Sequence, residues 1–377
     1  MKTIRAAVLG TGFMGRTHTE AIRRLGNVEV AAVAGSSEEK ARAFAEAWSI
    51  PRACGWREAI DAAEAVHVGT PNHLHYPMVK YALEAGKHVL CEKPLTLTAA
   101  EARELHALAE SKNVAHCVNH NLRFYPLVQQ ARSMIAAGEL GEILVVNGTY
   151  FQDWMYFDTD WNWRASAEEG GELRAMGDIG SHWMDLIQHL TGMKITALCA
   201  DLQTFHRTRQ RPKGPVETFT GHRSPAAETE TVQVATEDFG MVLIHLGDRA
   251  RGFFAVSQVA AGRKNRFDIE IYGSKCSLAW NQERPDQLWI GRRNSPNGLL
   301  IKDPALMEAR AASFADQPGG HSEGYDDTHK QMFKRFYARV ADPSAPADYP
   351  TFADGVRGME LLEKVLESSR RRSWVSC

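Results

Sequence analysis

The sequence predicts two domains: a parallel α/β sheet covered by helices, and then an α+β domain built on a large, mainly antiparallel, open sheet. The chain has 377 residues, more than one hydrophobic core usually serves. In its first third, short apolar runs alternate with helical patterns, whereas alternating strand-like runs follow one another further on. We therefore expect a first domain at residues 1–124 and a second at residues 125–377.

In the first domain we expect five strands that are apolar along almost their whole length. Such runs are typical of parallel strands that are buried on both faces of a sheet. Helical segments separate them. The strands are expected at Ile4–Leu9, Val28–Ala34, Ala65–Gly69, His88–Cys91 and Val114–Val118, and the helices at Met14–Leu25, Glu38–Trp48, Leu74–Ala85 and Ala99–Ser111.

The second domain combines helices with strands whose apolar residues alternate, which predicts a large antiparallel sheet. Helices are expected at Leu127–Ala137, Ile179–Leu190, Gly324–Val340 and Phe352–Ser368, and strands at Glu142–Tyr150, Thr231–Glu237, Met241–Leu246, Gly252–Val259, Arg266–Tyr272 and Ser277–Asn281. The stretch 208–228, rich in Arg, Pro and Gly, is expected to be a loop.

Composition argues against several classes of protein. The net charge of −2 gives no electrostatic reason to expect nucleic acid or an anionic membrane as a partner. No apolar run approaches the roughly 20 residues of a membrane-spanning helix. Residues 1–5 lead straight into the first expected strand, so we expect no signal peptide. The six cysteines have neither CxxC nor zinc-like spacing, so we expect no metal site and a reducing, cytoplasmic location.

A glycine-rich turn, Gly10-Thr11-Gly12-Phe13-Met14-Gly15, follows the first strand and opens the first helix. In such a turn the first glycine permits the tight bend, the second lets the backbone approach a pyrophosphate, and the third allows close packing of helix and strand. The phosphates would lie over the N–H groups of the helix N-terminus. The turn therefore predicts a Rossmann-type dinucleotide site, with NAD or NADP as the cofactor.

The end of the second strand bears on the choice between the two cofactors. An NAD site commonly has an acid there that accepts hydrogen bonds from the ribose 2′-hydroxyl, whereas this chain has the run GSSEEK at residues 35–40. Ser36, Ser37 and Lys40 could hold a 2′-phosphate, which slightly favours NADP. Glu38 and Glu39 lie close by, and Lys40 could be a solvated helix residue, so NAD stays open.

Further motifs accompany the glycine-rich turn: GTPNH at residues 69–73, CEKP at 91–94, NHNLRFYP at 119–126 and GDIGSHWMD at 177–185. With these motifs the chain resembles the glucose–fructose oxidoreductase/inositol dehydrogenase (Gfo/Idh/MocA) family over essentially its whole length. The resemblance implies further cofactor contacts from Thr70, Pro71, Asn72, His75, Glu92, Lys93 and Asn121.

Alcohol oxidation needs a base for the hydroxyl proton, and histidine, which titrates near neutrality, suits that role. Asp178 and His182 are four residues apart and would share one helix face, so the carboxylate could orient the imidazole and raise its pKa. Lys93 would supply a fixed positive charge to the reacting oxygen. In the family resembled, the catalytic residues stand at the positions of Lys93, Asp178 and His182. Each also has a structural interpretation: a surface lysine, a helix cap and a core histidine.

Asp185, one helical turn beyond the histidine, could bind a substrate hydroxyl or simply lie on a polar helix face. His120 is close enough to a strand end to touch substrate, while Arg123 either binds substrate or braces the joint between the domains. Trp161 and Trp163 suit the apolar face of a sugar ring, although a core plug or a subunit contact fits them equally well. The full set of expected substrate contacts is Lys93, His120, Arg123, Trp161, Trp163, Asp178, His182 and Asp185.

These observations predict an enzyme that interconverts a secondary hydroxyl and a ketone on a sugar, a sugar derivative or a cyclitol; the resemblance alone gives the substrate class. Two alternatives stay open. One is a transhydrogenating or redox-assisted sugar enzyme that keeps its cofactor bound. The other is a non-catalytic dinucleotide-sensing regulator, which would be expected to lack the lysine or the histidine. The resemblance also implies a homodimer or homotetramer that pairs through the open sheet.

Overall fold

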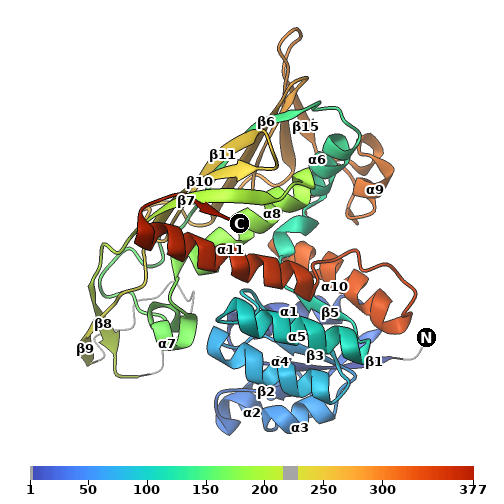
Figure 1. Cartoon of the computed structure of the whole chain (residues 1–377). Helices are drawn as coiled ribbons and strands as arrows, with labels where there is room; N and C mark the ends of the chain where they lie inside the picture. The colour runs from blue at the N-terminus through green and yellow to red at the C-terminus, as the bar shows by residue number, and fades with distance from the viewer. Residues whose placement is uncertain (1–2, 215–227) are drawn as a thin grey trace.

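The computed structural model describes residues 3–214 and 228–377 and contains a five-stranded sheet and a nine-stranded sheet, with a separate two-stranded sheet (Figure 1). The two large sheets lie one above the other in Figure 1, and the long helix α11 (Phe352–Arg371) runs between them. Within the described ranges, no helix is both long enough and apolar enough to cross a membrane. The predicted pair of sheets is confirmed.

The first sheet is entirely parallel, with the strand order β2-β1-β3-β4-β5. Helices cover both of its faces, which explains why its strands are apolar along their whole length. The strand order reverses next to β1, and open α/β sheets bind ligands beyond the carboxyl ends of the strands at such a point. The strands are β1 (Ile4–Leu9), β2 (Val28–Ala34), β3 (Ala65–Val68), β4 (His88–Cys91) and β5 (His116–Val118), and the helices are α1 (Phe13–Arg23), α2 (Glu38–Ala47), α3 (Trp56–Asp61), α4 (His75–Glu84) and α5 (Ala99–Lys112).

The second sheet is mainly antiparallel, in the order β15-β14-β13-β12-β6-β11-β10-β7-β16, with β6 and β11 parallel to each other at its centre. The sequence pattern missed β7, β14, β15 and β16, most of which are short and have weak alternation. The strands are β6 (Ile143–Phe151), β7 (Ile195–Gln203), β10 (Phe239–Leu246), β11 (Ala250–Ser257), β12 (Arg266–Gly273), β13 (Ser277–Asn281), β14 (Gln287–Gly291), β15 (Gly298–Ile301) and β16 (Val375–Ser376).

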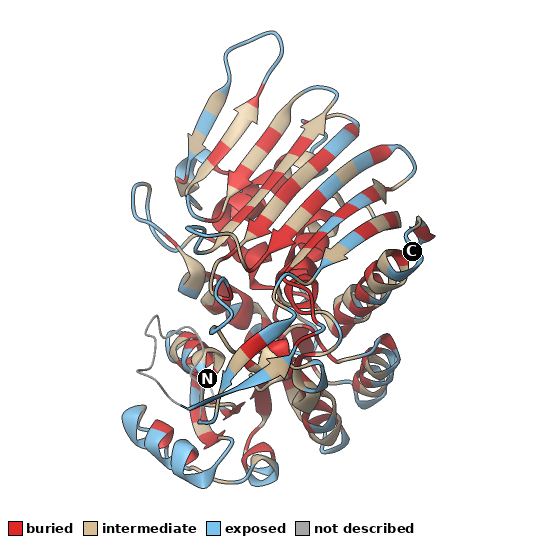
Figure 2. Cartoon of the chain, turned by 90° about the vertical axis from the view of Figure 1, so that its left-hand side faces the viewer, coloured by how far each residue is buried: buried red, intermediate tan, exposed pale blue. Residues whose placement is uncertain are grey.

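One face of this sheet packs on α6 (Pro126–Ala136), α8 (Ser181–Thr191) and α11. Trp183 of α8 stacks on Phe254 of β11 with ring centroids 4.4 Å apart, and both side chains are fully buried. The neighbouring Phe253 points to the opposite face and is 49% exposed. Figure 2 shows this alternation of buried and more exposed residues along the strands.

The expectation of a loop at residues 208–228 is wrong for its first part. β8 (Thr208–Pro212) pairs with β9 (Thr229–Gln233) in the two-stranded sheet, so the expected strand at Thr231–Glu237 does not belong to the large sheet either. Polar cross-strand pairs such as Arg211–Glu230 join the two strands. Polar residues dominate β8, so no apolar alternation marked it in the sequence, whereas the strand expected at Thr231–Glu237 overlaps β9. Residues 215–227 lie outside the described residues.

A late helix returns to the first sheet. α10 (Tyr325–Ala341) packs on α1, and its Phe333, Phe336 and Tyr337 lie in the same buried core as β1 and β2. The first sheet is therefore covered on one side by a helix that comes more than 200 residues after its last strand. The division of the chain at residue 124 stays a prediction.

Replacing Phe254 with Ala should lower the free energy of unfolding by about 3–5 kcal/mol, because a fully buried ring that stacks on Trp183 would leave a cavity. Denaturant unfolding followed by tryptophan fluorescence measures the loss. Phe205→Ala, which removes a ring that is 58% exposed, is the control and should cost less than about 1 kcal/mol. Equal losses in the two variants would contradict a central role for the stack.

Candidate active site

Packing requires two of the glycines in the turn between β1 and α1. Gly10 has a φ of +111°, and a Cβ there would lie 2.4 Å from the carbonyl oxygen of Gly69. A Cβ on Gly15 would lie 2.0 Å from the carbonyl oxygen of Gly10. By contrast, a Cβ on Gly12, the N-cap of α1, would meet nothing within 4 Å. The turn is tight on the inside and open over the helix N-terminus, so the residues present fit a dinucleotide pyrophosphate.

The predicted cofactor residues nearest this turn contact α10. Phe13 stacks on Tyr325 with a centroid distance of 6.1 Å, and the Tyr325 hydroxyl donates to Met14 Sδ at 3.6 Å. Asn121 Nδ2 donates to Thr328 Oγ1 at 2.9 Å. The helix that covers this side of the first sheet thus also borders the predicted cofactor site.

The loop after β2 lies against the glycine-rich turn, since a Cβ on Gly35 would come within 3.2 Å of Thr11 Cγ2. Ser37 is the N-cap of α2, and its hydroxyl accepts the backbone N–H of Lys40 at 3.2 Å. Ser36 and the Lys40 side chain are exposed. One of the three residues expected to hold a 2′-phosphate therefore already caps a helix.

The cofactor residues predicted after β3 are Thr70–Asn72 and His75. Among them, the side chains of Asn72 and His75 form hydrogen bonds with backbone carbonyl oxygens. Asn72 Nδ2 donates to the carbonyl oxygen of Gly170 at 2.8 Å. The buried His75 ring lies between two carbonyl oxygens, with Thr70 at 3.0 Å and Pro94 at 2.9 Å. Burial lowers the pKa of His75, so the ring is neutral and donates to one of them. These contacts join the β3 loop to the turn that carries Glu92 and Lys93.

Glu92 is buried at the carboxyl end of β4. Its Oε1 lies 3.0 Å from His18 Nε2 and accepts a hydrogen bond from Asn119 Nδ2. Burial acts to raise the pKa of this carboxyl group, but His18, Lys93 and Asn119 outweigh burial and lower the pKa to about 2. Glu92 is therefore a fixed anion beside Lys93.

Lys93 meets Asp178 across the gap between the two sheets. The Lys93 Nζ donates to Asp178 Oδ1 at 2.6 Å and to the Asp178 carbonyl oxygen at 2.7 Å, and the two side chains are only 11% and 10% exposed. Arg164 Nε donates to the same Oδ1 at 3.1 Å, and Gln258 Nε2 donates to Oδ2 at 2.9 Å. Burial acts to raise the pKa of Asp178, but the Arg164 and Lys93 charges hold it well below its usual range.

Asp178 is not a helix cap. It lies inside a π-helical turn, Met176–Gly180, and α8 begins only at Ser181, with Gly180 at the N-cap and no side-chain cap bond. A π-helical turn contains more residues than an α-helical turn, so a spacing of four no longer stacks side chains as in an α-helix. This explains why, in the described parts of the chain, no hydrogen bond joins Asp178 to His182. The expected orientation of the imidazole by this carboxylate is absent.

His182 lies in the first turn of α8 against two other rings, with His120 at 5.6 Å, almost perpendicular, and Tyr150 at 6.3 Å. Its Nδ1 is buried and has no hydrogen-bond partner among the described residues. Burial, then the charges of Lys93 and His120, lower the pKa of His182 well below its ordinary value, although Asp178 raises it. The expectation of a raised pKa is therefore wrong, because desolvation outweighs the carboxylate. The imidazole is neutral at neutral pH.

Arg123 braces the joint between the two sheets. It donates two hydrogen bonds to Asp185 on α8, one of them from Nε to Oδ2 at 2.8 Å, and a third to Asp354 on α11 at 2.7 Å. Both oxygens of Asp185 thus accept from Arg123. His120 Nδ1 lies 3.9 Å from Asp185 Oδ2 and is buried. Burial lowers the pKa of His120.

The aromatic loop, which we define as residues 152–166, joins β6 to the helix-rich segment before Asp178. Trp163 lies under the Arg164 guanidinium at 4.3 Å, and Arg164 in turn reaches Asp178. Trp161 lies under Arg211 at 5.6 Å and packs against a small apolar cluster at the base of the loop. Trp163 is thus linked to the predicted catalytic residues, and Trp161 lies nearer to the β8–β9 hairpin.

Two residues of this site escaped the sequence reasoning. Arg164 directly follows Trp163, and a cation beside aromatic residues was a usable signal. Gln258 comes directly after β11 and is 80 residues from Asp178 in the sequence. No local sequence pattern distinguishes it from a surface glutamine.

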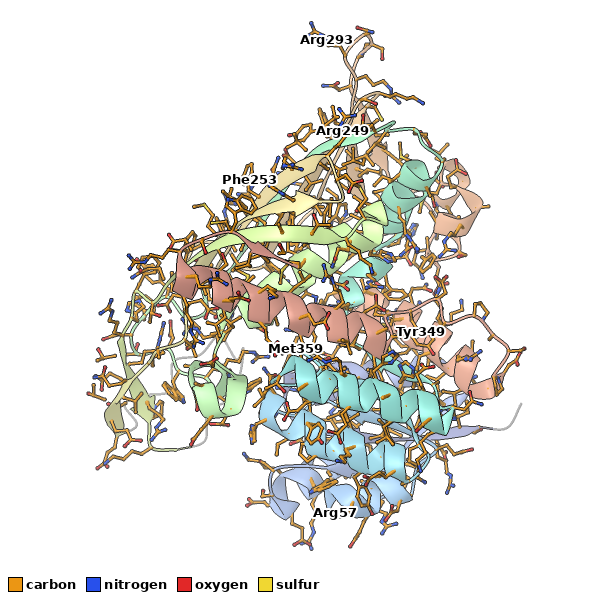
Figure 3. The ribbon with its side chains drawn as sticks, viewed as in Figure 1. Arg57, Arg249, Phe253, Arg293, Tyr349 and Met359 are labelled. Carbon is orange, nitrogen blue, oxygen red and sulfur yellow. The ribbon has the colours of Figure 1, made fainter. Side chains whose placement is uncertain are left out.

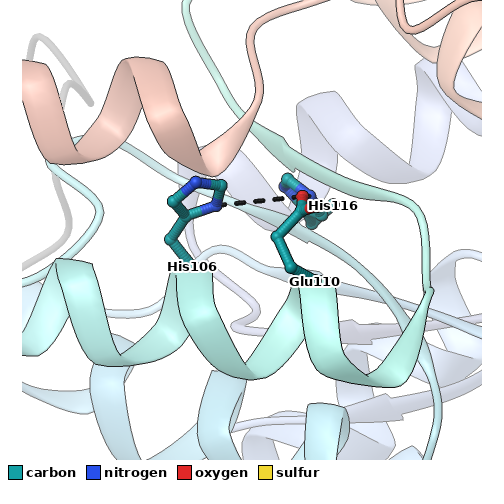
Figure 4. A group of neighbouring side chains, drawn as sticks. All are labelled: His106, Glu110 and His116. Carbon is teal, nitrogen blue, oxygen red and sulfur yellow. Dashed lines mark hydrogen bonds and ion pairs between the residues drawn. The ribbon is translucent and has the colours of Figure 1, made fainter.

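One group of potential metal ligands occurs in the described ranges: His106, Glu110 and His116, whose ligand atoms lie within 4.8 Å of one another (Figure 4). His116 Nδ1 accepts the backbone N–H of Phe352 at 3.1 Å, so the neutral ring carries its proton on Nε2, which donates to Glu110 Oε1 at 2.9 Å. This hydrogen bond and the 4.0 Å contact of His106 Nδ1 with Glu110 Oε1 hold the group together at the amino end of β5, opposite the active-site edge.

Comparison with known proteins agrees with these features. Residues 4–120 match an oxidoreductase family with an NAD-binding Rossmann fold, and residues 128–279 match the GFO/IDH/MocA C-terminal domain. A levoglucosan dehydrogenase from Pseudarthrobacter phenanthrenivorans is 28% identical over 397 residues, which covers 100% of this chain and 98% of that protein.

Solved structures are similar to this protein over its whole chain, and two of them bear on the cofactor and the substrate class. Levoglucosan dehydrogenase in complex with NADH and L-sorbose has a TM-score of 0.89 at 28% identity, covering 100% of this chain and 99% of that one. An inositol dehydrogenase homologue from Azotobacter vinelandii, complexed with NAD+, has a TM-score of 0.85 at 26% identity, covering 100% and 98%. The chain therefore belongs to the Gfo/Idh/MocA family of oxidoreductases with an NAD-binding Rossmann fold.

Proposed function

We propose that this protein reversibly oxidises a secondary hydroxyl of a sugar, a sugar derivative or a cyclitol to a ketone, with NAD as its cofactor. The observation that carries the proposal is the grouping of Lys93, Asp178 and His182 at the carboxyl edge of the first sheet, beside the glycine-rich turn. The names of the two similar proteins, a levoglucosan dehydrogenase and an inositol dehydrogenase homologue, support the substrate class.

Lys93 is the electrostatic group of this mechanism. Its ammonium is held by Asp178 and lies in a largely buried setting, where a fixed charge acts more strongly on a developing alkoxide than it would in water. Asp178 acts on the lysine rather than on the histidine. Arg164 and Gln258 hold the carboxylate in place from the other side.

His182 is the base. Its neutral ring accepts the hydroxyl proton as the carbon–hydrogen bond breaks, and the protonated ring returns the proton in the reverse reaction. His120, whose ring faces His182, borders the same position. Trp163, which packs on Arg164, would cover an apolar sugar face beside it.

The turn from Gly10 to Gly15 would hold the pyrophosphate, and Thr70–Asn72 with Glu92 would border the nicotinamide end. When bound, NAD supplies the hydride acceptor. We favour NAD over NADP because Ser37 is already used as a cap and Glu38 and Glu39 occupy the first turn of α2, where they would repel a 2′-phosphate. The complexes of similar proteins with NADH and NAD+ support this preference.

A substrate screen tests the activity. Purified protein is mixed with sugars, anhydrosugars and cyclitols, each with NAD and separately with NADP, and absorbance at the reduced nicotinamide band is followed. We expect at least one secondary alcohol to be oxidised faster with NAD. A complete absence of turnover across these classes would count against the proposal.

We also propose a cytoplasmic location. All six cysteines are free thiols, and Cys91 and Cys117 lie buried on the neighbouring strands β4 and β5 without forming a disulfide. Free thiols are typical of proteins from reducing compartments.

We further propose that two copies pair through the second sheet. The face opposite to α8 carries Val145, Met241, Leu243 and Phe253, each between 41% and 49% exposed, and strand register places them on one side of the sheet. Phe253 is labelled in Figure 3, on the outer side of this sheet. Contiguous exposed apolar surface of this kind marks protein interfaces.

Lys93→Ala should reduce turnover by roughly 10²-fold or more, since it removes a preorganised electrostatic donor, while NADH affinity stays within about twofold. Steady-state kinetics and NADH fluorescence titration measure the two quantities. The control is Lys87→Ala at the opposite end of β4. The Lys87 ammonium donates hydrogen bonds to the carbonyl oxygens of Asp61 and Ala63. Normal turnover in the Lys93 variant would overturn its role.

The rate of alcohol oxidation should fall at low pH as His182 becomes protonated, with an apparent pKa in kcat/KM below the ordinary histidine value. Because the Asp178 charge favours the protonated ring, Asp178→Asn should move this acidic limb to still lower pH and also reduce the maximal rate by loosening Lys93. Initial rates over a pH series measure both effects. His106→Gln, outside the site, should leave the limb in place. A limb that moves upward would contradict the assignment.

Phe253→Asp should convert the assembly to a monomer, because each copy would bury an unpaired charge in the interface. Sedimentation velocity gives the mass in solution. Leu306→Asp, which changes an exposed leucine in the short turn Pro304–Leu306, should leave the mass unchanged. A wild-type protein that is monomeric at micromolar concentration would refute the pairing.

A further inference from the structure

Two arginines and one aspartate form a buried ion cluster beside the active site: Arg174, Arg209 and Asp238. Asp238 Oδ1 accepts from Arg209 Nη2 at 2.7 Å and also from Arg174 Nη2, and the three side chains are 0% exposed. Removing charges from water carries a large free-energy cost for each ion, and replacing such groups by apolar residues is often neutral or stabilising. Stability alone is therefore a poor explanation for the cluster.

The cluster is linked to the turn that carries Asp178. Glu237 accepts the backbone N–H groups of residues 174 and 176 at 2.9 and 2.7 Å, at the start of the π-helical turn. The carbonyl oxygen of Asp238 accepts the backbone N–H of Gln258 at 3.0 Å, and the Gln258 side chain donates to Asp178. The pair Glu237–Asp238 thus supports Asp178 from two directions.

The cluster is also linked to the aromatic loop. Arg209 Nη1 donates to the carbonyl oxygens of Phe157 at 2.7 Å and Asp160 at 3.1 Å, and Nη2 donates to that of Met155 at 3.0 Å. One guanidinium therefore holds three carbonyl groups of the loop on one side, while Asp238 fixes it on the other. Asp238 also accepts two backbone N–H groups next to β8, at residues 205 and 206.

We propose that Arg209, anchored by Asp238, is a positioning residue that sets the aromatic loop against the substrate. The inference rests on the proposed function, in which this loop covers the substrate. Arg209 does not touch the predicted catalytic residues. It acts through the loop backbone, which carries Trp161, Trp163 and Arg164, and Arg164 completes the path by donating to Asp178.

The chemistry of the side chain explains why arginine stands here. Its planar group has five donors in a fixed fork, enough for one carboxylate and three carbonyl groups at once, whereas lysine has three donors on a single nitrogen. Arg209→Lys therefore preserves the charge beside Asp238 and removes most of the fork. It also keeps the buried charge balance, so the variant is expected to fold.

The test is the kinetics of Arg209→Lys with an oxidisable sugar or cyclitol from the screen. We expect KM to rise about tenfold or more, the scale of losing one to two hydrogen bonds, with a smaller fall in kcat, and NADH affinity within about twofold. The matched control is Lys213→Met, since Lys213 follows the same strand and pairs on the surface with Glu228. An unchanged KM together with a lower melting temperature would overturn the proposal. It would show that the ion cluster only stabilises the fold.

Hydrogen exchange of the wild type and Arg209→Lys, without substrate, separates this proposal from the proposed function. We expect faster exchange confined to the aromatic loop, with the first sheet unchanged. If exchange in the loop is unchanged, the positioning role fails whatever the enzyme oxidises. If the loop loosens and the screen finds no sugar or cyclitol substrate, the link from Arg209 to the loop stands and the proposed function fails.

Discussion

The ion pair between Lys93 and Asp178 is the contact on which the architecture of the site depends. Lys93 follows β4 of the first sheet, and Asp178 lies on a turn that the second sheet supports, so the pair forms only when both sheets are assembled. The attraction within a buried ion pair offsets the free-energy cost of desolvation only when the geometry is good and further hydrogen bonds are present. Here the carboxylate receives them from Arg164 and Gln258, both from the part of the chain that follows the first sheet. The ammonium therefore projects from the first sheet but is oriented by the second.

The same two residues act in opposite directions on the neighbouring histidine. Burial and then the Lys93 charge disfavour the protonated His182 ring, and together they outweigh the Asp178 charge, which favours it. The ring therefore stays neutral. Buried charges elsewhere follow one pattern: Glu92, Arg123 and Asp238 each have several fixed partners, which satisfies them without water.

The sequence determined the features that depend on local backbone chemistry and on periodicity. Continuous apolar runs identified the parallel strands, and the GxGxxG spacing identified a turn in which Gly10 and Gly15 have no room for a side chain. Alternation identified the central strands of the second sheet. The resemblance to the family, which motifs of a few residues carry, predicted one site for Lys93, Asp178 and His182 before any distance was known.

Only the tertiary structure decided what those side chains do to one another. The four-residue spacing of Asp178 and His182 suggested a direct contact, but a π-helical turn changes which face each occupies. β8 has no apolar period that would mark it as a strand, and the carbonyl groups that Arg209 binds lie about 50 residues away in the chain. Hydrogen-bond partners, burial and pKa depend on groups that are distant in sequence and close in space. A linear pattern records the residue but not the surroundings that fix its charge.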